Sequence, residues 1–166
     1  MRRPLVFFSI VLAGVLCDLC SKKVVFDWLD ETRDYPLIRD VLQFHLAANE
    51  GAAFSVLKQH PAILLLITVA MLAMLTLYYL RVWRGAHGLL LAALALLMIG
   101  AAGNLYDRVR FHYVRDFIDF MPELPLIGHW AVFNLADVCI TVGVGLYAIY
   151  ALFHDKPAVK NEASSV

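Results

Sequence analysis

The chain has 166 residues, of which 61% are apolar and 17% are charged, and its mean hydropathy is +0.71. A soluble domain of this length would be nearer half apolar, so the composition predicts a membrane protein. The 14 basic and 14 acidic residues balance to a formal net charge of zero. Because there is no basic excess to contact phosphates, a nucleic-acid partner is not expected.

Four apolar stretches are long enough to supply the roughly 20 helical residues that cross the hydrocarbon core of a bilayer. They cover about residues 4–26, 61–80, 88–107 and 130–153. Backbone amides in lipid must be satisfied within their own segment, so each stretch is predicted to be a helix. We therefore expect an all-α membrane protein with one domain, 1–155, followed by a polar, disordered tail, 156–166.

The first stretch has a second interpretation, because an MRR start followed by an apolar run also opens secretory signal peptides. A lipoprotein-type signal would place a cysteine directly after Leu12-Ala13-Gly14, but Val15 stands there. An uncleaved first helix is therefore the preferred interpretation.

The basic residues that flank the stretches predict their orientation, since cytoplasmic loops are enriched in lysine and arginine. One side of the membrane carries Arg2, Arg3, Arg81, Arg84, Lys156 and Lys160. Both termini are therefore expected in the cytoplasm, as is the tail. The opposite segments also hold basic residues, but these are mixed with acids.

The two segments on the outer side, about 27–60 and 108–129, are too short to form independent domains. Residues 41–46 and 114–118 have the partly alternating pattern of short strands, and Pro122 and Pro125 end any continuing element. We expect small β-like and loop elements that lie on the outer membrane surface.

Three of the stretches carry polar or small residues three or four positions apart, which is the spacing of one helix face. These stripes are Gly14, Asp18 and Lys22; Gly100, Asn104 and Arg108; and Asn134, Asp137 and Thr141. Helices associate in lipid through small residues and hydrogen bonds, so the three faces are expected to converge on one polar pocket near the outer interface. The second stripe also suits a helix end that meets lipid headgroups.

Asp137 is the only carboxylate in the apolar run 130–153. A charged side chain at the membrane centre costs roughly 2.5 to 3.5 kcal/mol on insertion scales, so it is rarely kept without a use. A second aspartate, Asp116, lies 21 residues earlier. Two carboxyl groups held close together share one proton and offer a base and an acid. The pair is therefore interpreted as an aspartyl protease dyad at a membrane surface, which activates water and needs no cofactor.

Other interpretations of the polar groups remain open. Asp18 and Lys22 also suit a neutralising pair that lets the helix insert. A proton-coupled transporter would use intramembrane Asp and Lys but predicts polar groups at both faces, and a structural partner predicts that Asp137 tolerates Asn.

Cys17 and Cys20 have C-x-x-C spacing, for which apolar packing is favoured over redox chemistry. The histidines form no metal-site pattern.

Five segments resemble, in order and spacing, the motifs of bacterial lipoprotein signal peptidase, also called signal peptidase II. They are DLCSK (18–22), NEGAAFS (49–55), GAAGNLYDR (100–108), VRDF (114–117) and FNLAD (133–137). The likeness covers nearly the whole chain. Departures from the family pattern are Ile99 in place of a glycine, Glu50 in place of a threonine, and Arg115 in place of an apolar residue beside Asp116.

The resemblance implies an aspartyl endopeptidase of the bacterial inner membrane, with an active site near the periplasmic face. It implies that diacylglyceryl-modified prolipoproteins are cut on the amino side of the lipidated cysteine, with Asp116 and Asp137 as the catalytic pair. We expect the enzyme to be a monomer in contact with membrane lipids.

Further residues of these motifs are expected to support the site. Asn49, Gly51, Asn104, Arg108 and Asn134 would orient a carboxylate, the substrate main chain or a lipid headgroup. Asp18 and Lys22 would buttress the pocket, Phe54 would form a lid, and Gly100 and Ala136 complete the set of supporting positions.

Overall fold

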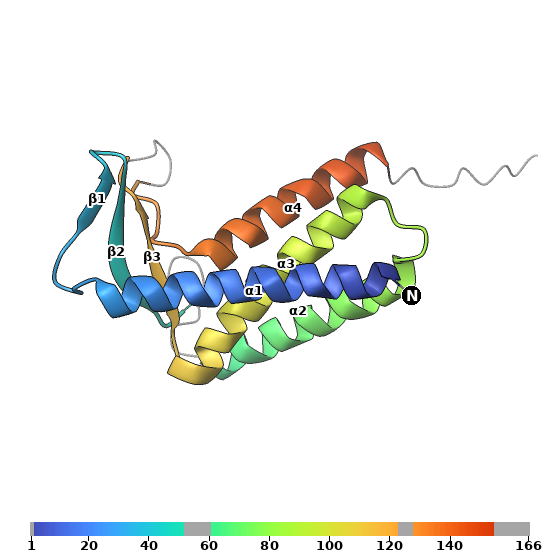
Figure 1. Ribbon diagram of the computed structural model, residues 1–166, viewed down its shortest axis with the longest axis horizontal. Coiled ribbons are helices and arrows are strands. Elements are labelled where there is room, and N and C mark those ends of the chain that lie inside the picture. Colours follow the sequence, from blue (N-terminus) through green and yellow to red (C-terminus); the bar gives the residue numbers. More distant parts are fainter. Residues whose placement is uncertain (1, 52–60, 123–127, 155–166) are drawn as a thin grey trace, which may run out of the picture.

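The computed structural model describes residues 2–51, 61–122 and 128–154. Four helices and three strands follow one another along these residues (Figure 1). They are α1 (Arg2–Trp28), β1 (Tyr35–Ile38), β2 (Leu42–Asn49), α2 (Pro61–Val82), α3 (Gly88–Phe111), β3 (Val114–Phe120) and α4 (Leu135–Phe153). The predicted lid residue Phe54, the predicted break at Pro125 and the predicted disordered tail lie outside the described residues.

All four helices are long and apolar enough to cross a membrane, which confirms the four predicted spans. Large apolar side chains cover their outer faces: Leu5, Leu66 and Leu152 are 71%, 69% and 79% exposed. Such faces are costly in water and favourable against lipid tails. The exposed apolar surface is therefore the surface that lipid covers.

The fourth helix begins later than predicted, at Leu135 rather than at the start of the apolar run at 130. Asn134 ends the preceding loop: its side chain accepts a bond from the backbone N–H of Asp137, whose carboxylate accepts from the backbone N–H of Asn134. This reciprocal capping box starts a helix at that residue. Phe133 instead pairs with Ile118 of β3 as an isolated bridge. Hydropathy alone does not separate such an apolar loop from the helix that follows it.

α3 is the central helix and contacts α1, α2 and α4 (Figure 1). Its buried residues Leu94 and Met98 pack with Phe7 of α1 and Tyr79 of α2. The rings of Phe7 and Tyr79 stack with their centroids 3.9 Å apart. Because α3 touches every other helix, it sets how their polar stripes meet.

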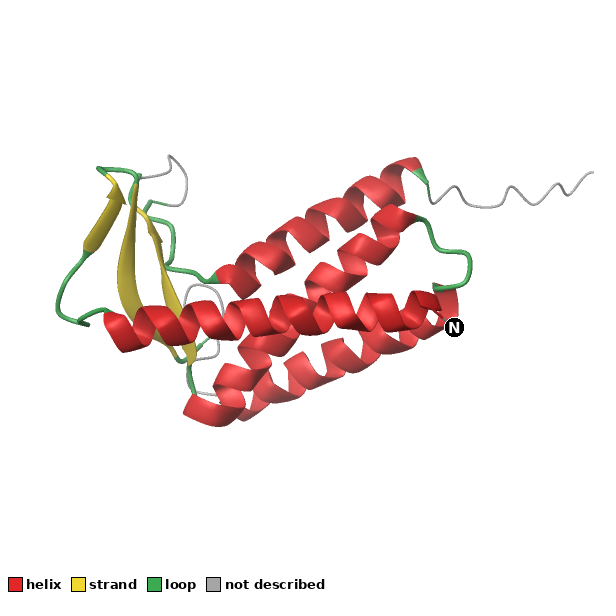
Figure 2. Ribbon diagram, viewed as in Figure 1, coloured by secondary structure: helices red, strands yellow, loops and turns green. Residues whose placement is uncertain are grey.

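The three strands form one antiparallel sheet, in the order β1-β2-β3, at one end of the bundle (Figure 2). β2 and β3 lie where the sequence predicted strands, whereas β1 was not predicted. It has only four residues, one of them Pro36, and its pairing with β2 is irregular. The start of α1 and the end of α4 lie at the other end of the bundle (Figure 1).

Cys17 and Cys20 are exposed on α1, and both are free thiols, as is the half-buried Cys139. Both cysteines therefore lie outside the buried core of the bundle, and the preference for apolar packing over redox chemistry stays a prediction. The helical spacing of two cysteines does not reveal which side of a helix faces the bundle.

Candidate active site

The two aspartates reach the same place from different elements. Asp116 lies in β3 and is 1% exposed, while Asp137 lies in the first turn of α4 and is half-buried. Asn134 contacts both: its Nδ2 donates to Asp116 Oδ1 at 2.6 Å, and its backbone N–H donates to Asp137 Oδ2 at 3.1 Å. One buried residue therefore sets the relative position of the two carboxyl groups.

Both polar atoms of the Asn134 side chain are used. Its Oδ1 accepts a hydrogen bond from the backbone N–H of Asp137 at 3.1 Å. Besides its bond to Asp116, its Nδ2 donates a second hydrogen bond to Asn104 Oδ1 at 3.2 Å. Asn134 is fully buried, so each of these bonds replaces a bond to water. A fully satisfied buried amide has one favourable orientation, which holds the bridge between β3 and α4 rigid.

A second layer of polar contacts links α1 and α3 to the start of α4. Asn104 Nδ2 donates to Asp137 Oδ1 at 2.8 Å, and Asn104 Oδ1 accepts from Lys22 Nζ at 3.0 Å. Lys22 also pairs with Asp18 at 2.8 Å, and both side chains are fully buried. Asp18 Oδ1 accepts from the backbone N–H of Ala136 at 2.9 Å, where a negative charge favours the helix start. The predicted convergence of the three stripes is therefore confirmed.

Two glycines of α3 permit this convergence. A Cβ on Gly100 would collide with the backbone oxygen of Ala136, and a Cβ on Gly103 would collide with the carboxylate of Asp18. Small residues at a helix interface let backbones approach closely, as happens here between α3, α1 and α4. The absence of a side chain at Gly100 therefore permits the close packing of α3 against α4.

The end of β2 is tied to the site from the other side. Asn49 Nδ2 donates to Asp116 Oδ2 at 2.8 Å, and Asn49 Oδ1 accepts from the backbone N–H of Gly51 at 3.1 Å. Arg108 Nη2 donates to the carbonyl oxygen of Gly51 at 3.1 Å. The chain after β2 is thus held between Asp116 and α3.

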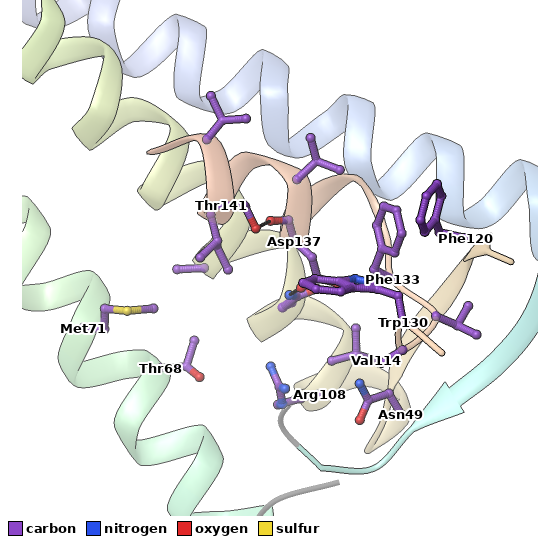
Figure 3. Close-up of a pocket in the computed structure, with 17 residues that line it drawn as sticks. Asn49, Thr68, Met71, Arg108, Val114, Phe120, Trp130, Phe133, Asp137 and Thr141 are labelled. Carbon is purple, nitrogen blue, oxygen red and sulfur yellow. Dashed lines mark hydrogen bonds between the residues drawn. The ribbon is translucent and has the colours of Figure 1, made fainter. Parts of the chain in front are cut away.

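A cavity of about 640 Å³ lies beside Asp137 (Figure 3). Asp137, Arg108 and Asn49 give it polar groups from α4, α3 and β2, and Thr68 and Met71 line it from α2. Apolar side chains form most of the remaining wall: Val114, Phe120, Trp130, Phe133, Val138 and Ile140. A mostly apolar cavity with a few convergent polar groups is the usual form of a ligand site.

The surroundings of Asp116 strongly raise its pKa. Burial, followed by the negative charge of Asp137, raises the pKa of Asp116 to about 7. The amide donors of Asn49 and Asn134 act in the opposite direction, because they stabilise the ionised form. Asp116 therefore retains a proton in a pH range where an ordinary aspartate is ionised.

Two charged contacts near the site were missed from the sequence. Asp107, which is fully buried, pairs with Arg115 at 2.8 Å. Asp119, 5% exposed, accepts from Gln43 Nε2 at 2.8 Å and lies 3.1 Å from His129 Nε2. Asp107 follows the polar stripe of α3 at helical spacing, which was an available signal. The Asp119 contacts had no such signal, because Gln43 is 76 residues away and His129 lies outside any helix or strand, where no regular spacing relates it to Asp119.

The fold and the site together define the class of protein. Four helices that can span a membrane, together with the sheet at one end of the bundle, place Asp137 on a cavity and join it to the buried Asp116 through Asn134, as in an integral-membrane enzyme. Two solved structures, both described as bacterial membrane enzymes studied by the in meso method, share this fold. One has a TM-score of 0.79 and 26% identity, covering 97% of this chain and 94% of the other. The second has a TM-score of 0.77 and 28% identity, covering 91% and 94%.

Residues 10–153 match the sequence profile described as Signal peptidase (SPase) II, so the chain belongs to the signal peptidase II family. Similar proteins include the lipoprotein signal peptidase of Halothermothrix orenii, 34% identical over 90% of this chain and 97% of that protein. The lipoprotein signal peptidase of Geobacter sulfurreducens is 35% identical, covering 87% and 89%. The one of Chlorobaculum tepidum is 34% identical, covering 95% and 98%. The family consists of peptidases that remove signal peptides from prolipoproteins, which confirms the resemblance seen in the sequence.

Proposed function

We propose that Asp116 and Asp137 are the catalytic pair that removes signal peptides from diacylglyceryl-modified prolipoproteins. The observation that carries this proposal is the placement of Asn134, which donates a hydrogen bond to each carboxyl group. Such a contact holds the two carboxyl groups near each other, and the charge of Asp137 helps to raise the pKa of Asp116, as in the coupled acid and base of an aspartic peptidase.

The surroundings of the two aspartates suggest a different role for each. Asp137 lines the cavity and, when ionised, takes a proton from a water molecule that attacks the scissile carbonyl carbon. Asp116, whose pKa lies at about 7, gives its proton to the carbonyl oxygen as the tetrahedral intermediate forms. In the collapse of the intermediate the C–N bond breaks, the proton held by Asp137 passes to the leaving amine, and one hydroxyl proton of the intermediate returns to Asp116, which restores both aspartates to their starting forms. No covalent intermediate and no cofactor are required.

The remaining polar groups of the cavity suit the substrate main chain. Arg108 and Asn49 line the cavity and can meet peptide carbonyl groups. The apolar walls and the contribution of α2 suit a helical signal peptide and the acyl chains of a diacylglyceryl group, both of which arrive from lipid. Cleavage on the amino side of the lipidated cysteine would place that lipid beside the aspartates.

For the orientation, we place both termini in the cytoplasm and the sheet, with the site, at the periplasmic face of the bacterial inner membrane. The buried charged groups of the site lie at the sheet end of the bundle, and the start of α1 and the end of α4 lie at the other end (Figure 1). The basic residues Arg81 and Arg84 at the latter end favour the cytoplasm. The enzyme is proposed to act as a monomer, because one chain supplies both aspartates.

The test replaces each aspartate by the neutral isostere, in Asp116→Asn and Asp137→Asn, and follows cleavage of a diacylglyceryl-modified prolipoprotein by purified enzyme in detergent micelles. Each variant is expected to lose about a hundredfold or more of the cleavage rate, since it lacks one partner of the acid–base pair. The matched control is Asp40→Asn, at an exposed residue with a φ of 57°, a conformation that asparagine accepts. Near-parental cleavage by either active-site variant would rule out the catalytic pair.

The lipid requirement is tested separately, by comparing the modified prolipoprotein with the same protein lacking the diacylglyceryl group. We expect the unmodified form to be cut far more slowly. Equal rates would leave the catalytic pair intact and remove the proposed role of the lipid.

A further inference from the structure

Arg115 departs from the family pattern, and the structure shows what its side chain contacts. It directly precedes Asp116 on β3 and is 7% exposed. Neighbouring side chains of a strand point to opposite faces, so its guanidinium lies on the face of β3 away from the Asp116 carboxyl group. A buried guanidinium is costly unless it is paired and hydrogen-bonded.

Asp107 of α3 supplies the partner through three contacts. Its Oδ1 accepts from Arg115 Nη2 at 2.8 Å and from Arg115 Nε at 3.2 Å, and its Oδ2 accepts from the backbone N–H of Arg115 at 3.0 Å. The guanidinium also lies 4.4 Å from the centre of the Phe111 ring. Arg115 thus joins the start of β3 to the last turns of α3, one residue before Asp116.

The same carboxylate of Asp107 belongs to a larger buried network. Asp107 lies 3.4 Å from Lys22, which is also paired with Asp18 at 2.8 Å, and all three side chains are fully buried. Without Arg115, one ammonium group would face two carboxylates. With Arg115, two cations balance two anions beside the site.

We propose that Arg115 is a positioning residue for the aspartate pair: through Asp107 it fixes β3 on α3 and completes a neutral network of two carboxylates and two cations next to Asp116. This inference rests on the proposed catalytic pair. Arg115 thus has two effects on the pair, one on its geometry and one on its charge, and each has its own experimental signature.

Removing the charge of Arg115 and removing the charge of Asp107 are expected to shift the pH at which the aspartate pair loses its shared proton in opposite directions. Removal of the Arg115 charge leaves the network with one excess negative charge, which holds the shared proton of the pair to higher pH. Removal of the Asp107 charge leaves one excess positive charge, which releases that proton at lower pH. The other charged groups around Asp116 remain the same in both cases: Asp18 and Lys22 of α1, Arg108 of α3 with the nearby Glu50 and His112, and Asp137 of α4.

The experiment measures kcat/KM against pH for cleavage of a diacylglyceryl-modified prolipoprotein in detergent micelles. In Arg115→Met the limb at high pH is expected to move up by about half a pH unit or more, and in Asp107→Asn down by a similar amount. The double variant Asp107→Asn/Arg115→Met is expected to return to the parental position. A merely structural role would lower activity without moving the two single variants in opposite directions.

The effect of Arg115 on the position of β3 is tested by Arg115→Lys. Lysine keeps the positive charge but cannot donate two hydrogen bonds to Asp107 in the way that Nε and Nη2 of arginine do. We expect a parental pH position with kcat reduced by between about tenfold and a hundredfold and KM nearly unchanged, since Asp116 is displaced while the cavity is intact. The matched control is Arg110→Met, an exposed arginine of the same helix end whose guanidinium lies 5.6 Å from the same Phe111 ring. It is expected to match the parent.

Several outcomes would overturn the inference. These are an unmoved pH profile in Arg115→Met, shifts of the same sign in both single variants, or full kcat in Arg115→Lys. If Asp107→Asn does not fold, the Arg115→Met profile alone decides, because Asp107 keeps its contact with Lys22 there. Failure of the proposed function has a different signature: the Asp116→Asn enzyme would still cleave the substrate.

Discussion

At the scale of single residues, the carboxyl group of Asp116 has exchanged solvent for two amide donors and a second carboxylate. If its proton is the one delivered in catalysis, kcat/KM is expected to fall as the pH rises through about 7, the pKa of Asp116. The measurement is the pH profile of prolipoprotein cleavage by the parent enzyme. A rate that stays level well above that pH would show that the proton of Asp116 is not needed.

The same raised pKa links the stability of the fold to pH. Between the ordinary value of 3.8 and about 7, the folded protein holds a proton on Asp116 that the unfolded chain releases. The contribution of this proton to the free energy of unfolding is full below pH 3.8 and is lost as the pH rises through about 7.

Asp116→Asn removes this dependence, which gives a prediction for thermal unfolding in detergent. The Tm of the parent relative to that of the variant is expected to be higher at about pH 4 than at about pH 8. A pH-independent difference between the two proteins would mean that the pKa of Asp116 is not raised in the folded state.

At the scale of elements, the close approach of α3 to α4 depends on Gly100. Gly100→Val would drive a side chain into the backbone oxygen of Ala136 and the side chain of Ile140, and backbone cannot move aside cheaply. We expect a loss of about 1–3 kcal/mol in the free energy of unfolding and a larger loss of cleavage, because α4 carries Asp137.

Gly85→Ala is the matched control for that substitution. It lies in the loop between α2 and α3, where a Cβ meets nothing within 4 Å. Thermal unfolding and cleavage are measured for both variants, and Gly85→Ala should resemble the parent. A stable, active Gly100→Val protein would show that the helices can separate without disturbing the pair.

The elements also differ in how well the sequence predicted them. α2 and α3 were predicted closely because each is a continuous apolar run, and hydropathy reports length and burial in lipid directly. The start of α4 was misplaced because the capping box at Asn134, not hydropathy, decides it. β1 gave no usable signal, because four residues that include Pro36 acquire strand geometry only by pairing with β2.

At the scale of the whole molecule, the proposed orientation places the β1–β2 turn outside and the α2–α3 loop inside the cytoplasm. Single cysteines at Asp40 and Gly85, introduced with Cys17, Cys20 and Cys139 replaced by serine, report these two positions. A membrane-impermeant maleimide is expected to label Asp40→Cys in cells with a permeabilised outer envelope, and Gly85→Cys only after the inner membrane is opened. The reverse pattern would invert the topology.

The sequence by itself determined the class of the protein, the four apolar spans and the polar faces of three helices, because apolar length and helical spacing are local properties. It placed Asp18, Asn104 and Asp137 on polar helix faces before any contact was known. The likeness of five motifs to signal peptidase II agreed with these local signals.

Only the tertiary structure decided which of these groups touch. Asn49 and Asp116 are 67 residues apart and Asp18 and Ala136 are 118 apart, so no spacing rule connects them. The same holds for charge: Arg115 stands next to Asp116 in the sequence but turns to Asp107 on the other face of β3. Whether a charge acts on a catalytic group depends on distance, burial and pairing, which exist only once the helices and the sheet have packed.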